Sequence, residues 1–327
     1  MSDISTTYMG LNLKSPLIAG SCGLTDNVDN LKRIEAAGAG AVVLKSLSEE
    51  EIIEEKIKTA TSGFYSSFHT EAFEYISQMS MHFGPENYLK LIREAKSEIS
   101  IPVIASVNCI NNEYWVDFAS KIEAAGADAL ELNISRVTVD PQESSENILQ
   151  DYMEVVKAVK SAVKIPVAVK LGQNFTNISR FVKMIEFSKV QSIVLFNRFY
   201  QIDIDIDSET LTPGYSLSSP NDVTETLRWI SLISGITKMT IAGSKGIHST
   251  ADVIKVLLAG ASAAQVVSAL YADGFDFIKR ANEGLAEWMD KKNYNKISDF
   301  IGLLNQKNIP NPEVWEREQY IKARLNV

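Results

Sequence analysis

Short runs of apolar residues recur along the chain, separated by longer stretches in which apolar positions return every three or four residues. Because buried parallel strands read as continuous apolar runs, the short runs predict strands at 17–20, 41–45, 103–107, 129–133, 167–170, 192–196, 240–242 and 264–267. The helical spacing predicts helices at about 27–37, 86–98, 112–124, 145–162, 176–188, 222–234 and 249–259.

This alternation of eight strands with helices is typical of a (β/α)8 TIM barrel, an α/β fold. An open, doubly wound sheet is the alternative. Such a sheet usually has fewer strands and carries a glycine-rich turn after the first one, whereas Ser21-Cys22-Gly23 lacks the G-x-G-x-x-G spacing. The barrel is therefore the prediction.

Three stretches share one pattern, a helix end followed by a glycine turn and a buried strand. They read AAGAGAVVLKS at 36–46, AAGADALELN at 124–133 and LAGASAAQVVS at 258–268. Nine positions beyond each start lie Lys45, Asn133 and Val267, so we expect three strands to deliver these residues to equivalent places. Repeated units of this kind predict a parallel sheet.

The segment 240–270 suggests a phosphate-binding site. An apolar run ends in Gly243-Ser244-Lys245-Gly246, Ser249 opens a helix, and a second apolar run ends at Val267-Ser268. Glycines and hydroxyls at the ends of parallel strands can direct backbone N–H groups at an anion, and a helix N-terminus adds a favourable dipole. An ordinary turn between a strand and a helix is the alternative.

Other segments lie outside the repeating pattern. Extended pieces at 6–9 and 11–14, joined through Gly10, predict a hairpin that plugs the bottom of the barrel. The connections at 46–85 and 198–220 are longer than plain loops. Long insertions after barrel strands lie on the active-site face and act there as lids. The second insertion contains IDIDID, which predicts a short strand.

Length and charge restrict the class of protein. With 327 residues, 45% of them hydrophobic, the chain can bury a large core. No Pro-, Gly- or Ser-rich linker divides it, so we expect a single domain over residues 1–327. Lys and Arg number 32 against 41 Asp and Glu, and the net charge of −9 argues against nucleic acid or an anionic membrane as the partner.

The sequence also lacks the signals of secretion and metal binding. No apolar run approaches the roughly 18–20 residues of a membrane span, and the amino terminus has no basic or apolar signal region. We therefore expect a cytoplasmic protein. Cys22 and Cys109 form neither a disulfide framework nor a metal-binding spacing, so we expect free thiols and no metal.

The ends of the predicted strands converge on one mouth of a barrel. They supply Gly20, Ser21, Lys45, Ser46, Asn108, Asn133, Lys170, Asn197, Lys245, Gly246, Val267 and Ser268. Lysine and asparagine side chains at the ends of apolar strands are costly to bury without partners, so together they predict a site for an anionic, hydrogen-bonding ligand. The alternative is that each one makes a local hydrogen bond or salt bridge.

On these residues the chain resembles the class 1 dihydroorotate dehydrogenases and their close relatives, which are FMN-dependent (β/α)8 enzymes. The resemblance runs from about residue 6 to residue 302. It implies that FMN is bound by Gly20, Ser21, Lys45, Ser46, Asn133, Lys170, Phe196, Ser218, Lys245, Gly246, Val267 and Ser268. It places Lys170 at the N1 side of the flavin, where a cation stabilises the anionic reduced form after a hydride reaches N5. The family usually has glycine at Lys245 and Val267, but the backbone N–H groups there stay available for the phosphate.

The substrate side departs from the family. The family's N-L-S-C-P-N stretch after the fourth strand reads Asn133-Ile134-Ser135-Arg136-Val137-Thr138 here, so arginine replaces the cysteine that serves as catalytic base. Arginine keeps its proton at neutral pH, so Arg136 would bind an anion or stabilise a developing oxyanion. Ser135 and Thr138 are the nearby hydroxyls that could serve as base. Alternatively, Arg136 pairs with the acidic residues of 49–55 and closes a lid.

Two further positions on the substrate side also differ. The family's N-S-M-G loop has no clean counterpart in residues 76–81, and its Asn-Ser pair after the sixth strand becomes Asn197-Arg198. The chain therefore matches the family at the flavin-binding positions and differs from it at the substrate-binding positions.

We predict an FMN-dependent oxidoreductase that passes a hydride between a carbon of a small anionic substrate and flavin N5. Substrate would be held by Lys45, Asn133, Asn197 and Arg198, and catalysis would involve Arg136, Lys45 and Ser135. Three functions stay open: the family's oxidation of dihydroorotate to orotate in pyrimidine biosynthesis, the reaction of another conjugated anion, and a flavin- or phosphate-binding barrel without turnover. The electron acceptor is unknown. Resemblance to the class 1A branch, with the added surface of 198–220, predicts a symmetric homodimer.

Overall fold

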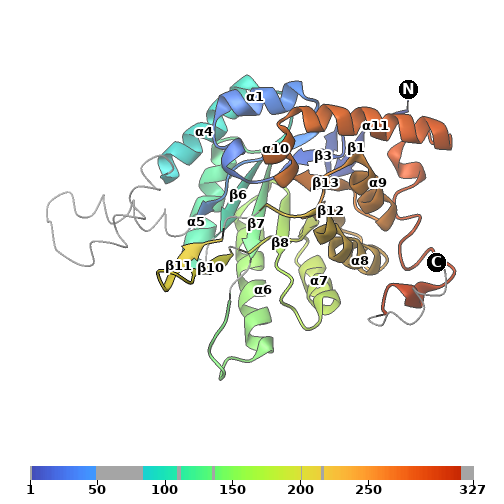
Figure 1. The fold of residues 1–327 in the computed structure, drawn as a ribbon. Helices are drawn as coiled ribbons and strands as arrows, with labels where there is room; N and C mark the ends of the chain where they lie inside the picture. The colour runs from blue at the N-terminus through green and yellow to red at the C-terminus, as the bar shows by residue number, and fades with distance from the viewer. Residues whose placement is uncertain are drawn as a thin grey trace, which may run out of the picture.

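The computed structural model describes residues 2–48, 84–108, 112–134, 137–199, 201–214 and 217–317. Within these ranges, eight parallel strands close into a barrel in the order β3, β4, β6, β7, β8, β9, β12, β13 and back to β3 (Figure 1). Their bounds are β3 Leu17–Ala19, β4 Ala41–Val43, β6 Val103–Asn108, β7 Ala129–Ile134, β8 Val167–Leu171, β9 Ser192–Leu195, β12 Thr240–Ser244 and β13 Ala263–Val266. The predicted (β/α)8 barrel is confirmed, and the predicted strands end within two residues of the observed ones.

Helices follow the strands and cover the outside of the barrel (Figure 1). They are α1 Val28–Ala36, α4 Pro85–Glu98, α5 Asn112–Ala124, α6 Ser145–Ala162, α7 Ile178–Phe187, α8 Val223–Ser234 and α9 Thr250–Ala259, and each was predicted. Two more, α10 Ser268–Asp273 and α11 Asp276–Lys292, follow β13 and were not predicted. Short 3-10 turns lie at Gly23–Thr25, Pro220–Asp222, Ile297–Asp299 and Pro312–Val314.

The glycine turns of the repeated pattern end three of the helices. Gly38 after α1, Gly126 after α5 and Gly260 after α9 have φ angles of 95°, 99° and 119°. Glycine adopts this left-handed conformation without the steric cost that other residues incur, so the helix stops and the chain turns into the next strand. Ser249 begins α9 as predicted, because its side chain accepts a hydrogen bond from the Asp252 N–H at 3.2 Å.

The predicted amino-terminal hairpin is confirmed and plugs one end of the barrel. Strands β1 Thr6–Tyr8 and β2 Leu11–Leu13 pair in an antiparallel ladder. Tyr8, Met9 and Leu13 are buried against mostly small residues inside the barrel: Ile18, Ala41, Val43, Ile104, Ala129, Ala168, Val194, Ala242 and Ala263. Because several of these are the first residues of their strands, the plug closes the end opposite to the strand carboxyl ends.

The two insertions are described to different extents. Of the first, β5 Leu47–Ser48 pairs in parallel with β6, while residues 49–83 lie outside the described part of the chain. The lid expected there, and the single domain over residues 1–327, therefore stay predictions. None of the helices in the described ranges is long and apolar enough to cross a bilayer.

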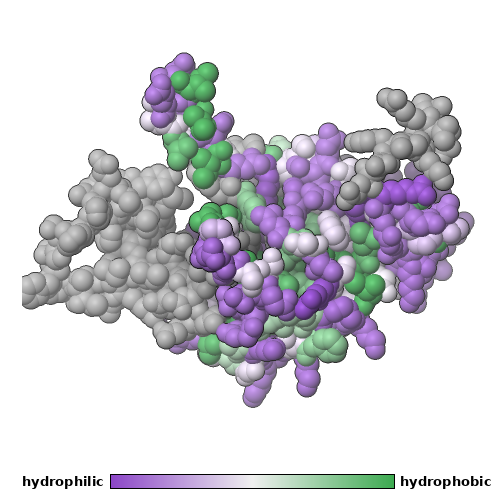
Figure 2. All heavy atoms as spheres, turned by 90° about the horizontal axis from the view of Figure 1, so that it is seen from below, coloured by the Kyte–Doolittle hydropathy of each residue, from purple (hydrophilic) through white to green (hydrophobic). Residues whose placement is uncertain are grey.

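The second insertion forms an antiparallel hairpin, β10 Ile202–Asp205 paired with β11 Thr210–Pro213, so the predicted strand is confirmed. Figure 2 shows the hairpin standing away from the body of the molecule. Its apolar residues alternate with aspartates, and Ile202, Ile204, Ile206 and Leu211 are between 62% and 83% exposed. An isolated pair of strands is marginally stable in water, so this exposed apolar face is unusual for a monomer.

The tight contact between Gly40, which precedes β4, and Ser15, which follows the plug, gives a testable prediction. A Cβ added at Gly40 would lie 1.9 Å from the backbone oxygen of Ser15, which a side-chain rotation cannot relieve. We expect Gly40→Ala to lower the free energy of unfolding by about 3 kcal/mol or more, measured by urea denaturation. Gly10→Ala is the control, because Gly10 has φ +80° but open space around it, and only the left-handed strain of about 1–2 kcal/mol applies. Equal losses in the two variants would contradict the packing argument.

Candidate active site

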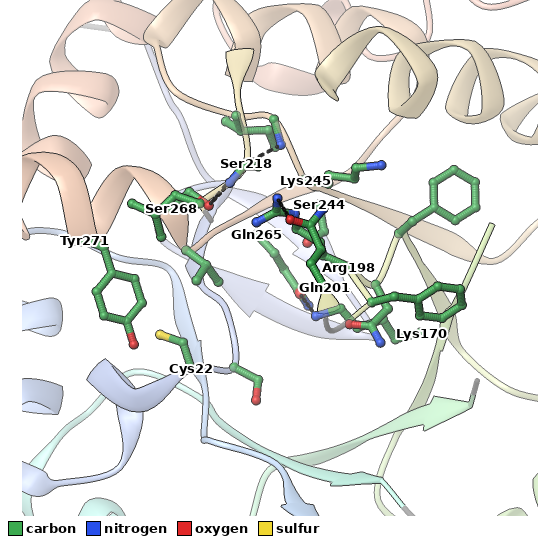
Figure 3. Close-up of a pocket in the computed structure, with 18 of the residues that line it drawn as sticks. Cys22, Lys170, Arg198, Gln201, Ser218, Ser244, Lys245, Gln265, Ser268 and Tyr271 are labelled. Atoms are coloured by element: carbon green, nitrogen blue, oxygen red, sulfur yellow. Dashed lines mark hydrogen bonds between the residues drawn. The ribbon is translucent and has the colours of Figure 1, made fainter. Parts of the chain in front are cut away.

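A pocket of about 380 Å³, a volume typical of small-molecule sites, lies at the carboxyl ends of the strands (Figure 3). Ten of the residues predicted from the sequence line it: Ser21, Lys170, Phe196, Asn197, Arg198, Ser218, Lys245, Gly246, Val267 and Ser268. Ser21 and Ser268, the outermost of them in the sequence, are 247 positions apart. They meet because every barrel strand ends at the same mouth.

Four of the predicted FMN-binding residues are not among the residues that line the pocket. Gly20 donates its N–H to the Val266 backbone oxygen at 2.9 Å, and Asn133 is the strand partner of Lys170. Lys45 and Ser46 follow β4, and the Ser46 hydroxyl lies 3.0 Å from that of Ser21. The predicted catalytic residues Ser135 and Arg136 lie outside the described residues.

The floor of the pocket carries a buried ammonium group. Lys170 is 6% exposed, and its Nζ donates to Gln265 Oε1 at 3.1 Å and lies 3.3 Å from Glu131 Oε1. Sequence analysis missed Gln265 and Glu131. The signal was a polar residue inside an apolar strand: Glu131 stands two positions before Asn133, so both face the same side of β7.

One end of the pocket gathers hydroxyl and N–H groups, as predicted for a phosphate site. The Ser218 Oγ donates to Ser268 Oγ at 2.9 Å and accepts from the Gly246 N–H at 3.3 Å. His248 Nε2 lies 3.0 Å from the same Ser218 oxygen and was not predicted. The tautomer of the His248 ring decides which of the two groups donates. All these groups can turn a hydrogen-bond donor toward an anion.

The loop that carries this end has an unusual backbone. Gly246 has φ +75°, and Lys245 has φ +80°, a left-handed conformation that non-glycine residues seldom adopt. The Lys245 Nζ donates to Gln173 Oε1 at 3.1 Å and lies 3.8 Å from Glu225 Oε2. The side chain thus ties the loop after β12 to the loop after β8 and to α8.

Ser21, which lines the pocket, is linked to a chain of hydroxyl groups. The Ser46 Oγ lies 2.7 Å from the Ser106 Oγ, in addition to its contact with Ser21. The Ser106 N–H donates to the Tyr88 hydroxyl at 2.7 Å, and that hydroxyl donates to the Ser106 backbone oxygen at 3.0 Å. The buried ring of Tyr88 therefore fixes Ser106, which in turn fixes the two serines at the pocket.

The rim is formed by the segment after β9 and by the base of the β10–β11 hairpin. Arg198 Nη2 donates to Gln201 Oε1 at 3.2 Å, and the Gly214 N–H donates to the Gln201 backbone oxygen at 2.9 Å. Arg198, Gln201 and Gly214 all line the pocket (Figure 3). The second insertion therefore lies on the pocket face, as expected.

All charged side chains among the described lining residues are positive. Lys170, Arg198 and Lys245 line the pocket, and no aspartate or glutamate is among the described lining residues. Cys22 also lines it, and burial raises the pKa of this thiol. A cysteine base needs an accessible thiolate, so Cys22 is in the wrong environment for that role. The electrostatics favour an anionic ligand.

The lining residues fit a flavin mononucleotide. The hydroxyl and N–H groups at one end suit a phosphate, Lys170 suits the polar edge of an isoalloxazine ring, and Phe196 and Val267 offer apolar surface for the ring. Asn133 Oδ1 is buried and accepts no hydrogen bond from the described residues. Such an unsatisfied acceptor is costly unless a ligand supplies a donor.

Comparisons with known proteins identify relatives of this chain over most of its length. The family model "Dihydroorotate dehydrogenase" matches residues 70–289. Two relatives are dihydroorotate dehydrogenase B (NAD(+)) catalytic subunits, from Thermoplasma volcanium at 33% identity and Thermoplasma acidophilum at 30%, each with 93% of this chain and 99% of the relative covered. Dihydroorotate dehydrogenase A (fumarate) of Lactobacillus delbrueckii subsp. bulgaricus is 28% identical, with 90% of this chain and 95% of the relative covered. The chain belongs to the dihydroorotate dehydrogenase family, and it is an FMN-dependent oxidoreductase that acts on a CH–CH bond.

Proposed function

We propose that the chain passes a hydride between FMN and a small anionic substrate that differs from dihydroorotate. The observation that carries the proposal is the substitution of the family's catalytic cysteine by Arg136. Arg198, which replaces a serine of the family and lines the pocket, supports it with a second cation. The family's own reaction, dihydroorotate to orotate, is the second candidate, supported by the names of the relatives.

In this proposal the residues that bind the flavin are those implied by the resemblance to the family. FMN, when bound, supplies the hydride acceptor and donor. Lys170 holds a positive charge at the ring edge, Asn133 supplies an amide to both ring and substrate, and Phe196 excludes water. Gly246, Ser218 and Ser268 hold the phosphate with one N–H and two hydroxyls.

The substrate side changes its chemistry because of the two arginines. A base that removes a proton from carbon must lose its own proton near neutral pH, and a guanidinium keeps its proton up to about pH 12. Arg136 would instead bind a carboxylate or phosphate, or donate to an oxygen on which negative charge develops. With Arg198 at the rim, a substrate with more negative charge than dihydroorotate is favoured, and the reductive direction gains from a cationic donor.

Stopped-flow reduction of the bound flavin tests this function. We expect dihydroorotate to bleach the flavin slowly or not at all, although a chemical reductant bleaches it. Arg136→Cys is expected to raise the rate with dihydroorotate by tenfold or more, because general bases contribute roughly 10²–10⁴-fold. Arg180→Cys, an exposed arginine on α7 paired with Glu146, is the matched control and should leave the rate unchanged. Rapid bleaching of the unmodified protein by dihydroorotate would refute the proposal.

The phosphate end gives a second prediction. Ser268→Ala removes a hydroxyl that would hydrogen-bond a charged phosphate, and such bonds contribute about 1.5–3 kcal/mol. We expect FMN affinity to fall by roughly tenfold or more, while the affinity for riboflavin, which has no phosphate, stays the same. Both affinities can be measured by flavin fluorescence, with Ser120→Ala on the exposed face of α5 as the control. An equal loss for both ligands would show that Ser268 acts on the fold and not on the phosphate.

The exposed hairpin gives a third prediction, that two copies of the chain associate into a symmetric dimer through it. Ile204 and Leu211 are opposite each other in the ladder and both are exposed, and an apolar surface of this kind is typical of an interface. We expect the protein to sediment as a dimer of the 36.2 kDa chain, and Ile204→Asp with Leu211→Asp to sediment as a monomer. Phe187→Asp, which replaces an 84% exposed residue on α7, should stay dimeric. A monomeric unmodified protein at micromolar concentration would remove this proposal.

A further inference from the structure

Glu131, Lys170 and Gln265 form a closed polar group inside the barrel, here named the Lys170 triad. They come from β7, β8 and β13, and Glu131 and Gln265 are each 1% exposed. Lys170 and Gln265 line the pocket (Figure 3), whereas Glu131 is absent from the described lining. The strand register explains this difference: Asn133 lies opposite Lys170, and Glu131 lies opposite Ala168, one layer deeper in the barrel.

The three side chains satisfy one another in a ring of contacts. Gln265 Nε2 donates to Glu131 Oε2 at 2.6 Å, and Gln265 Oε1 accepts from Lys170 Nζ at 3.1 Å. Glu131 Oε1 accepts no hydrogen bond within the described ranges, but it lies 3.3 Å from the same Nζ. The amide of Gln265 thus uses its donor on the carboxylate and its acceptor on the ammonium.

Among the described residues, the layer below the triad is mostly apolar. The next layer consists of small apolar residues, including Ala129 and Ala168, and of the plug residue Tyr8. Burial and the negative charge of Glu131 raise the pKa of the Tyr8 hydroxyl, so this neighbour stays neutral. A carboxylate on an apolar layer is costly unless a cation pairs with it, so Glu131 depends on Lys170.

Glu131 in turn changes the effect that Lys170 would have on the flavin. A flavin gains negative charge at its N1 edge when it is reduced, and the ammonium of Lys170 would stabilise that charge. A carboxylate 3.3 Å from the ammonium offsets part of its field at the flavin. The bound flavin would therefore experience the field of a paired lysine and not that of a lone one.

We propose that Glu131 and Gln265 are positioning residues that hold the Lys170 ammonium at the pocket floor and offset its charge. The three side chains together then set the reduction potential of the flavin. The inference rests on FMN being the cofactor and deepens the function of that site. It predicts that substitutions of Glu131 and Lys170 shift the reduction potential of the flavin in opposite directions. A merely structural role of the ion pair would not produce opposite shifts.

The first experiment measures the midpoint potential of the bound flavin. Glu131→Gln keeps the side-chain size and removes the charge, so we expect the reduced form to be favoured at least tenfold more, a rise of about 30 mV for a two-electron couple. Lys170→Met should shift the potential downward. Gln265→Glu, which adds a carboxylate near the ammonium, should also lower it. Asp117→Asn is the control, because it breaks an exposed ion pair with Lys121 and should leave the potential unchanged.

The second experiment needs no flavin. In flavin-free protein we expect Lys170→Met to lower the urea midpoint of unfolding strongly, because it leaves Glu131 buried and unpaired. Adding Glu131→Gln to that variant should restore part of the loss, since the orphaned charge is then gone. Strictly additive losses would overturn the triad as a unit, and an unchanged potential in Glu131→Gln would overturn its effect on the flavin. Failure to take up FMN would instead contradict the assignment of FMN as the cofactor. The comparison of unfolding midpoints in flavin-free protein would then still test whether Glu131 depends on Lys170.

Discussion

Closure of eight parallel strands around an apolar interior is the constraint on which the rest of the molecule depends. The lower interior is filled by small residues such as Ala41, Ala129 and Ala242, which leave room for the side chains of the plug. A closed barrel brings every strand end to one mouth, so polar residues from distant segments become neighbours there. The apolar filling below also means that any charge placed above it must find its partner among the polar residues nearer the mouth.

The pocket has two sides that are built differently. The side proposed to hold the flavin consists of strand ends and helix starts, whose positions are fixed by hydrogen-bond ladders and by packing against the core. The side proposed to hold the substrate includes the segment after β9 and the base of the β10–β11 hairpin, whose described residues are mostly exposed or half-buried. Residues of the second kind can change without loss of the fold. In the function proposed above, this would allow the chain to keep Lys170 and Ser268 while Arg136 and Arg198 stand in place of the family's cysteine and serine.

The buried charges at the pocket floor link the apolar barrel interior to the site above it. Lys170 lies at the base of the pocket, where Glu131 and Gln265 complete its contacts. Ion pairs of this kind add little to stability on their own, since desolvation consumes most of the attraction. Their value is that they fix the place and the field of one positive charge in a site where water is excluded.

The sequence by itself determined the fold, because helix and strand periods, the glycine turns and the Ser249 cap are local signals that the backbone obeys directly. It also determined most of the pocket, since strand ends in a barrel must converge. Only the tertiary structure decided which polar groups pair. The partners Gln265 and Glu131 are 134 residues apart, and Ser218 and His248 are 30 apart, so their contacts depend on the closed register of the barrel and not on any local pattern. Helix α11 shows the intermediate case, because Phe277, Ala281, Leu285 and Met289 recur at helical spacing, yet only the barrel supplies the surface that they bury.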